Sequence, residues 1–333
     1  MRGLSRLFLP TLALVCGSVL FSPPAHSATD IPDSPDFETW LKELRAEAQE
    51  RGVSDTILEE AFQGVRPLPR VIELDRSQPE GRWTLQQYLN NVVTAGRVKQ
   101  AKRRLKENQA LLDAVGKAYG VQPRFLVSLW GIETSFGHNT GGFKVIDALT
   151  TLAHDGRRSA YFRGELLDAL TILEQGHIQV RNMKGSWAGA MGQCQFMPSS
   201  FLKYAQDYDG DGKQDIWNTR GDIFASAANY LSKEGWKDDE TWGREVLIPK
   251  DFDATLAGED TIKTLSDWQA LGVRRIDGTD LPTRDLNASL ILIGDQNPRA
   301  FIIYDNFRTI LTWNRSYYFA VAVGTLADRI GRG

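Results

Sequence analysis

The sequence predicts a mainly helical α+β protein, and three observations predict it. Apolar residues recur at helical spacing through most of the chain after residue 33. Two short apolar runs, 290–293 and 301–304, are separated by the turn-forming residues 294–298, which is the pattern of a β-hairpin. A hydrophobic content of 42% and a charged content of 24% over 333 residues are typical of one large or two modest folded domains.

Residues 1–27 have the pattern of a secretory signal peptide and are excluded from the fold. Arg2 and Arg6 precede an apolar stretch, 7–21, and the segment ends in Ala25-His26-Ser27, a small-x-small cleavage site. The stretch is short for a membrane span, so we expect a protein exported to the periplasm.

Two further inferences concern the same segment. Cys16 follows Val15, whereas a lipoprotein needs a small residue there, so lipid anchoring is the less favoured alternative. Loss of the two arginines would take the net charge from −3 to −5, which argues against nucleic acid as a partner.

Residues 28–120 are expected to form a helical domain. Asp55 is a candidate helix cap, and three prolines within 67–82 predict a long loop or linker. The basic run 99–106 has two interpretations, a solvated helix face or a surface that attracts an anionic polymer.

The next part, 121–245, is rich in glycine and aromatic residues, with Pro123 and Pro198 suited to the first turns of two helices. We expect a small β-containing part over 246–304. The last part, 305–333, should return to helix over 317–330.

Glu133 is the strongest catalytic candidate. Helical spacing puts it on one face with Leu126, Leu129 and Trp130, where water is scarce. Desolvation and the negative end of a helix would raise the pKa of a carboxyl group there, and a neutral carboxylic acid can protonate a leaving group. The alternative is a buried glutamate held by an arginine or by backbone donors.

Residues 186–200 form a loop in which neutral hydrogen-bonding groups stand beside aromatic rings. Gly189 and Gly192 allow close backbone approach, and Gln193 and Gln195 offer amide donors and acceptors near Trp187. This combination suits a sugar, although a tight loop packed on a core would also account for it.

With this loop, the chain resembles the lytic murein transglycosylases of the B type (glycoside hydrolase family 103). The resemblance spans nearly the whole mature chain and rests on five segments in order: 131–137, 151–158, 186–200, 228–236 and 306–318. It implies a lysozyme-like core in 121–245, flanked by the helical domain and the small β part, with peptidoglycan glycan strands as substrate and cell-wall synthesis or remodelling proteins as candidate partners.

The resemblance also assigns roles. Glu133 matches the single catalytic acid/base of a lyase that needs no cofactor for its chemistry. Further positions match residues lining the glycan groove: Ser186, Gln195, Tyr230, Asn314 and, in the helical domain, Tyr88. The sequence departs from the family at Cys194, where proline is common, and at Trp313, where tyrosine is common.

The implied reaction cleaves the MurNAc-β-1,4-GlcNAc bond and forms a 1,6-anhydroMurNAc end without consuming water. It needs one carboxylate, and none of the acidic residues between Glu133 and Gln195 lies in the 186–200 loop. Two alternatives stay open, a hydrolytic muramidase and a non-catalytic peptidoglycan-binding module.

Residues 207–215 begin like a calcium loop, with Asp207, Asp209 and Asp211 at positions 1, 3 and 5 and the backbone carbonyl of Lys213 at position 7. The family resemblance implies a longer loop closed by Asp222. A structural Ca²⁺ is therefore expected, and an acidic surface turn is the alternative.

Other reactive residue types carry weaker signals. Cys194 is more typical of a small buried residue than of a nucleophile, and it has no partner for a disulfide in the mature chain. The four histidines lack metal-ligand spacing. Arg157 and Arg158 could meet carboxylates of the substrate or form structural ion pairs.

Overall fold

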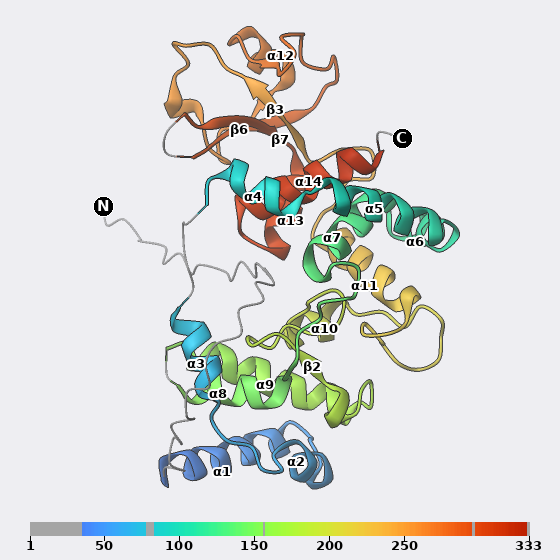
Figure 1. Ribbon diagram of the computed structural model, residues 1–333, viewed down its shortest axis with the longest axis vertical. Coiled ribbons are helices and arrows are strands. Elements are labelled where there is room, and N and C mark those ends of the chain that lie inside the picture. The colour runs from blue at the N-terminus through green and yellow to red at the C-terminus, as the bar shows by residue number, and fades with distance from the viewer. Residues whose placement is uncertain (1–34, 78–82, 156, 295–296, 332–333) are drawn as a thin grey trace. The chain divides into compact units, whose positions relative to one another are not determined.

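The computed structural model describes residues 35–77, 83–155, 157–294 and 297–331. The predicted signal peptide lies outside these residues. The fold is mainly helical with two small antiparallel sheets, which confirms the predicted α+β class (Figure 1). Within the described residues, no helix combines the length and apolar character needed to cross a lipid bilayer.

The chain divides into two compact units. Residues 83–128 and 231–331 form the sheet unit, and residues 35–77 and 129–230 form the Glu133 unit. The chain passes from one unit to the other within helices α7 (Pro123–Thr134) and α11 (Arg220–Lys233). These units differ from the domains expected from the sequence, because the expected helical domain contributes to both.

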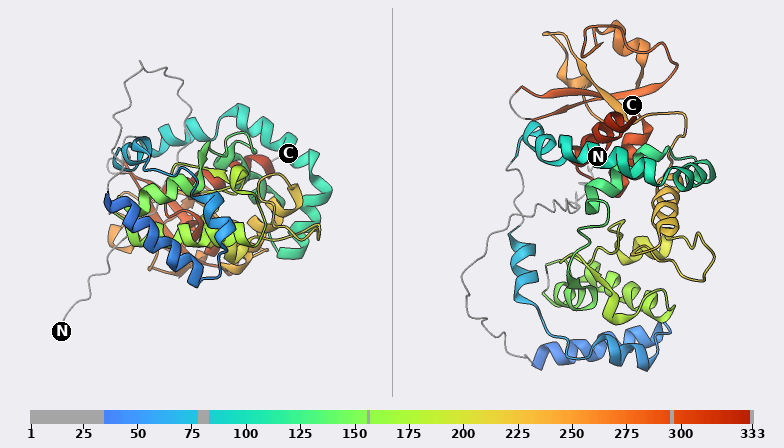
Figure 2. Two further views of the ribbon diagram at one scale, coloured as in Figure 1. Left: turned by 90° about the horizontal axis from the view of Figure 1, so that it is seen from below. Right: turned by 45° about the vertical axis from the view of Figure 1, so that its right-hand side comes forward.

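The sheet unit contains the helices α4 (Leu85–Val92), α5 (Ala95–Glu107), α6 (Gln109–Tyr119), α13 (Asp305–Trp313) and the C-terminal helix α14 (Tyr317–Gly331). Helix α14 lies against α4 and α5 in both Figure 1 and Figure 2. Gly324 of α14 leaves room for the Trp242 ring, since an added Cβ would lie 2.2 Å from it. The predicted helix over 317–330 is therefore confirmed.

The sheet of this unit has five antiparallel strands in the order β4 (Lys263–Thr264), β6 (Asn287–Ile293), β7 (Arg299–Ile303), β3 (Gly243–Leu247) and β5 (Arg274–Arg275). Strands β6 and β7 pair as the predicted hairpin, with Ile291 opposite Phe301.

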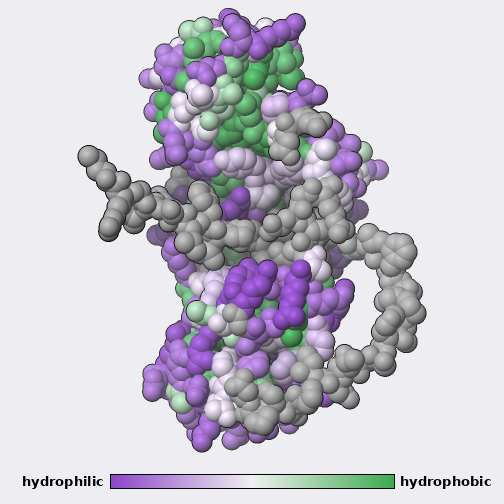
Figure 3. Space-filling view, turned by 90° about the vertical axis from the view of Figure 1, so that its left-hand side faces the viewer, coloured by the Kyte–Doolittle hydropathy of each residue, from purple (hydrophilic) through white to green (hydrophobic). Residues whose placement is uncertain are grey.

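A local core lies between this sheet and helix α12 (Leu265–Ala270). Trp268 of α12 is fully buried in it, and its indole N–H donates to the Ala288 carbonyl at 3.0 Å. Apolar surface also gathers over this part of the molecule (Figure 3), where Ile262 and Ile276 are each 58% exposed.

The Glu133 unit is built on helices α8 (Val145–His154) and α9 (Ser159–Glu174), which lie side by side. Its other elements are α1 (Pro35–Glu50), α2 (Asp55–Ala61), α3 (Pro69–Arg76), α10 (Pro198–Tyr204) and the pair β1 (Phe143–Lys144) with β2 (Lys184–Gly185). Pro123 and Pro198 each begin a helix, as predicted.

Two local predictions were wrong. The cap of α2 is Ser54, one residue before Asp55, and its hydroxyl accepts the Ile57 N–H at 3.4 Å. Residues 69–76, expected within a loop, form α3. Pro69 occupies the first helical position, where its missing N–H has no intrahelical partner to lose.

Candidate active site

Glu133 is the second-to-last residue of α7. Its side chain is half-buried, whereas Leu126, Leu129 and Trp130 on the same face are at most 3% exposed. The carboxyl group therefore lies beside buried apolar side chains and is still accessible to solvent. It also lies at the C-terminal end of the helix, which carries the negative end of the helix dipole.

The turn after α7 is strained. Ser135, Phe136 and Gly137 follow one another with φ of 50°, 62° and 85°, in the left-handed region. A non-glycine residue in this region costs free energy, and such strain gathers at functional sites. The Phe136 ring packs under the helix at Gly131, where an added Cβ would lie 2.7 Å from it.

Gln193 fixes the end of α7 to the 186–200 loop. Its Oε1 accepts the Trp130 indole N–H at 2.7 Å, and its Nε2 donates to the Trp217 carbonyl at 2.7 Å. The Thr134 hydroxyl lies 3.2 Å from the Gln193 carbonyl and accepts the Gly137 N–H at 3.0 Å. Gln193 thus holds residues on both sides of Glu133, Trp130 through its side-chain amide and Thr134 through its backbone carbonyl.

Ser186 and Gln195 shape the same loop. The Ser186 Oγ accepts the N–H groups of Ala188 and Ala190 at 3.3 and 3.0 Å. Gln195 has a φ of 52°, and its Nε2 donates to the Thr140 and Gly192 carbonyls at 3.2 and 2.9 Å. Ser186 and Gln195 both lie in the Glu133 unit.

Tyr230 of α11 packs in a cluster of aromatic rings that includes Phe196 of this loop. Tyr230 is 8% exposed and lies between Tyr204, at a ring distance of 4.3 Å, and Phe196, at 5.7 Å. Flat apolar faces next to amide groups suit the C–H face and hydroxyls of a sugar.

Cys194 is a buried residue of the loop, as the sequence favoured. Its Sγ–H donates to the Ile223 carbonyl at 3.3 Å. Burial raises the pKa of this thiol far above its ordinary value, and the charge of Glu133 acts in the same direction. A thiol kept protonated is a poor nucleophile.

The remaining two predicted groove residues belong to the sheet unit. Asn314 follows α13, is 7% exposed, and its Oδ1 accepts the Ser316 N–H at 3.1 Å. Tyr88 of α4 is 7% exposed and meets Tyr318 edge-on at a ring distance of 5.7 Å.

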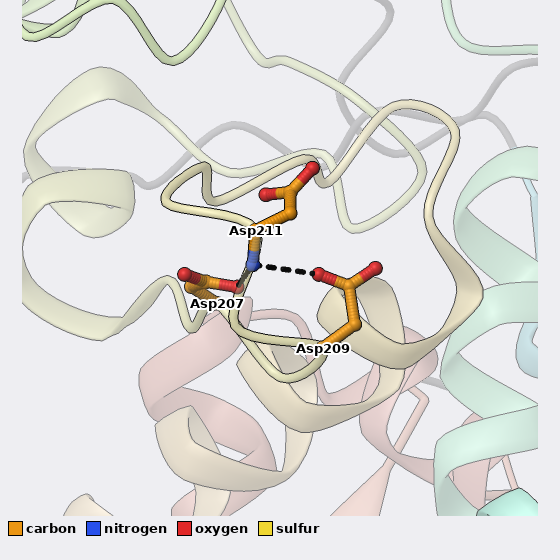
Figure 4. Close-up of side chains that lie close together, drawn as sticks. All are labelled: Asp207, Asp209 and Asp211. Carbon is orange, nitrogen blue, oxygen red and sulfur yellow. Dashed lines mark hydrogen bonds between the residues drawn. The ribbon is translucent and has the colours of Figure 1, made fainter.

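The acidic loop brings three exposed carboxylates together. One oxygen from each of Asp207, Asp209 and Asp211 lies within 4.8 Å of the others (Figure 4). Asp207 also organises the loop, because it accepts the N–H groups of Gly210 and Gly212 at 2.7 and 2.8 Å.

Asp222, the expected closing residue, is fully buried below this loop. Its two oxygens accept the N–H groups of Tyr208 and Asp215 at 2.8 and 2.7 Å. Burial, followed by the charges of Asp209 and Asp207, raises the pKa of Asp222. Hard oxygen donors of like charge fit a divalent cation, which would offset their repulsion.

Other groups considered from the sequence have structural partners. Arg157 and Arg158 both bind Asp75, at 2.8 and 2.6 Å, and Asp75 is only 2% exposed. His154 packs edge-on against Phe37 at 5.1 Å. These arginines therefore form the ion pairs that were the alternative to contact with substrate.

Sequence reasoning gave no role to Glu165 of α9, which is another buried acid. Its oxygens accept the N–H and the hydroxyl of Ser199 at 3.0 and 2.8 Å, which holds the first turn of α10. Burial is the main cause that raises the pKa of Glu165. The two residues are 34 positions apart, so no local pattern connects them.

Comparison with known proteins gives a consistent picture. Residues 36–328 match the family described as transglycosylase SLT domain. The chain is 28% identical over 316 residues to membrane-bound lytic murein transglycosylase B of Escherichia coli (strain K12), covering 90% of this chain and 84% of that protein.

Solved structures are also similar. SltB3 from Pseudomonas aeruginosa, in complex with NAG-anhNAM-pentapeptide, has a TM-score of 0.87 and 42% identity, covering 90% of this chain and 80% of that chain. The Escherichia coli lytic transglycosylase Slt35 in complex with calcium has a TM-score of 0.75 and 28% identity, with 91% and 94% covered.

Proposed function

The chain belongs to the transglycosylase SLT domain family, and from that premise we propose that it is a lytic transglycosylase that cleaves the MurNAc-β-1,4-GlcNAc bond of peptidoglycan. The observation that carries the proposal is Glu133, a half-buried carboxyl group on the last turn of α7. The complex of SltB3 with an anhydro-sugar pentapeptide supports the substrate class.

In the proposed mechanism, Glu133 acts first as an acid and then as a base. Its carboxyl proton passes to the oxygen that links MurNAc to GlcNAc, and the C1–O bond breaks. The acetamido group of the substrate stabilises the positive charge that develops at C1. The Glu133 carboxylate then takes the proton of the C6 hydroxyl, whose oxygen bonds to C1. Protons balance, and the product is a 1,6-anhydro sugar.

The remaining predicted residues would hold the glycan. Ser186 and Gln195 supply polar contacts from a loop fixed by its own hydrogen bonds, and Tyr230 supplies an apolar ring face. Asn314 and Tyr88 are proposed to contact the strand from the sheet unit. Groups held before substrate arrives lose little entropy on binding.

Product analysis tests this function. We expect digestion of purified murein by the wild-type protein to release muropeptides with anhydro ends, which are lighter than reducing ends by one water. The Glu133→Gln variant should lose turnover by several orders of magnitude and keep the wild-type melting temperature. Reducing ends alone would identify a hydrolytic muramidase. Unchanged turnover in the variant would remove Glu133 from the mechanism.

We also propose that the acidic loop binds one Ca²⁺ through Asp207, Asp209, Asp211, the Lys213 carbonyl and Asp222. The cluster of oxygens and the calcium complex of Slt35 support this. Calcium would stabilise the loop without taking part in the chemistry. Millimolar calcium should raise the melting temperature by several degrees, and Asp209→Asn should reduce this rise. An unchanged melting temperature would count against the site.

Action in the periplasm completes the proposal. It follows from the signal pattern of residues 1–27, and the Escherichia coli relative is named a membrane-bound protein. N-terminal sequencing of the protein from a periplasmic extract should give Ala28 as its first residue.

A further inference from the structure

Helix α5 presents a row of basic side chains to solvent. Lys99, Lys102, Arg103 and Lys106 are all exposed, and their spacing of three, four and seven residues puts them on one helix face. Ala101 on the opposite face is fully buried, so α5 packs against the fold by that side. We call these four residues the basic stripe.

The sequence around the basic stripe is poor in acidic residues. No aspartate or glutamate occurs between Glu80 and Glu107, a segment that contains seven lysines and arginines. Glu107 lies at the C-terminal end of the helix, 3.4 Å from Arg103 and 2.9 Å from Arg104. The stripe is a local positive surface on a chain whose net charge is −3.

From this surface we propose that the basic stripe binds carboxylates of the peptide stems of peptidoglycan, in addition to the sugar contacts of the 186–200 loop. The inference rests on the proposed function, because that function makes peptidoglycan the substrate. A peptide stem ends in a carboxylate, and the stem repeats along the strand. A lysine ammonium is a mobile point charge, which suits repeated exposed carboxylates better than a fixed bidentate pocket.

The same helix is poorly suited to a lipid surface. A helix that lies in a membrane interface needs an exposed apolar face beside its basic one. In α5, Val98 and Leu105 are half-buried and Ala101 is buried, so its large apolar residues do not form an exposed face. Single exposed ion pairs are weak, but a polymer engages several at once and binds through their sum.

Binding to purified sacculi tests the stripe. In a Glu133→Gln background, which prevents digestion, the stripe variant changes Lys99, Lys102, Arg103 and Lys106 to glutamine, a residue of similar helix propensity. A control with the same charge change replaces four exposed residues outside α5 by glutamine: Lys42, Arg66, Lys233 and Lys250. At low salt we expect sedimentation with sacculi to weaken about tenfold for the stripe variant and much less for the control.

A second arm identifies the chemical group. Sacculi whose carboxylates have been amidated should bind the stripe-intact protein and the stripe variant equally, because the partner charge is gone. Equal binding of both proteins to untreated sacculi would overturn the inference. The inference would also be overturned if the stripe variant lost binding to phosphatidylglycerol vesicles but bound sacculi as well as the stripe-intact protein does. The basic stripe would then bind a membrane.

Activity separates this inference from the proposed function. With Glu133 intact, the stripe variant should release anhydro products from a short soluble glycan at the wild-type rate and from sacculi more slowly. Absence of anhydro products from the wild type on either substrate would refute the proposed function, whatever the binding experiment shows. Equal rates on sacculi for wild type and stripe variant would refute the stripe alone.

Discussion

Three consecutive residues in the left-handed region follow the acid-bearing helix, and the last of them is the most constrained. Gly137 has a φ of 85°, and a Cβ there would lie 2.3 Å from the Gln193 Oε1, the atom that accepts the Trp130 indole N–H. A side chain at this position is therefore opposed by backbone strain and by a hydrogen bond next to Glu133.

The first prediction is that Gly137→Ala lowers the free energy of unfolding by about 3 kcal/mol, combining left-handed strain with overpacking. Gly176→Ala is the matched control, because Gly176 has a φ of 77° with nothing within 4 Å of its Cβ. It should cost about 1–2 kcal/mol, from strain alone. Urea denaturation measures both, and equal costs would show that the contact with Gln193 carries no weight.

Single residues differ in how far the sequence predicts them. The half-buried setting of Glu133 could be predicted because its apolar neighbours lie on its own helix, within seven positions. Gln193 looked like a sugar-binding group, yet its amide joins Trp130 to Trp217, which are distant in sequence. Asp75 gave no signal, because its partners Arg157 and Arg158 come 82 and 83 residues later.

At the scale of elements, helix α9 holds the start of α10 through Glu165 and the cap of α2 through Glu174. Burial raises the pKa of Glu165 above its ordinary 4.5, whereas hydrogen bonds from the Ser54 N–H and hydroxyl lower the pKa of Glu174. The two carboxyl groups of one helix therefore link folding to pH with opposite signs.

The second prediction follows from those signs. The folded protein holds the Glu165 proton more tightly than the unfolded chain does, so this group lowers stability as pH rises from about 4.5 through the folded pKa. Relative to wild type, Glu165→Gln should become more stable over that window, because glutamine can still accept the Ser199 N–H. Urea denaturation across pH 4–8 measures the difference.

The matched control is Glu174→Gln, which should show the opposite slope. The pKa of Glu174 is lower in the folded protein than in the unfolded chain, so this group adds stability at pH values above its unfolded pKa. That stability is lost as the pH falls through its folded pKa. The variant should therefore lose stability relative to wild type as pH rises. Parallel slopes for the two variants would contradict the assignment of Glu165 as a group that is costly to ionise.

Elements with a local signature could be predicted, and the others could not. The β6–β7 hairpin and the helices at Pro123 and Pro198 carry their own turn or first-turn residues. Helix α3 was missed because Pro69 resembles a breaker, although a proline fits a first helical position. Only tertiary contacts distinguish a proline that begins a helix from one that breaks it. One such contact is the Leu68 N–H, which donates to Thr151 Oγ1 at 3.0 Å.

On the scale of the whole molecule, each unit is made of two separate stretches of chain. The Glu133 unit combines 35–77 with 129–230, and the pairing depends on contacts between residues far apart in sequence. Arg163 of α9 binds Glu47 of α1 at 2.7 Å, and the Ser54 hydroxyl donates to Glu174 at 2.8 Å. A linear scan of composition cannot detect such a pairing, so the expected boundaries followed the chain instead.

The third prediction is that residues 121–245, expected from the sequence to be the core, do not fold alone. Without α1–α3 this fragment exposes the apolar faces that Leu44, Leu58 and Val71 cover in the intact chain, where each of these side chains has 0% exposure. It also leaves Arg157 and Arg158 without Asp75. Circular dichroism should show no cooperative melting.

A second fragment, residues 35–77, added in trans should restore cooperative melting, and the same fragment with Asp75→Ala should restore it less. A cooperative transition of 121–245 by itself would mean that the α1–α3 stretch is an accessory to this unit and not part of its core.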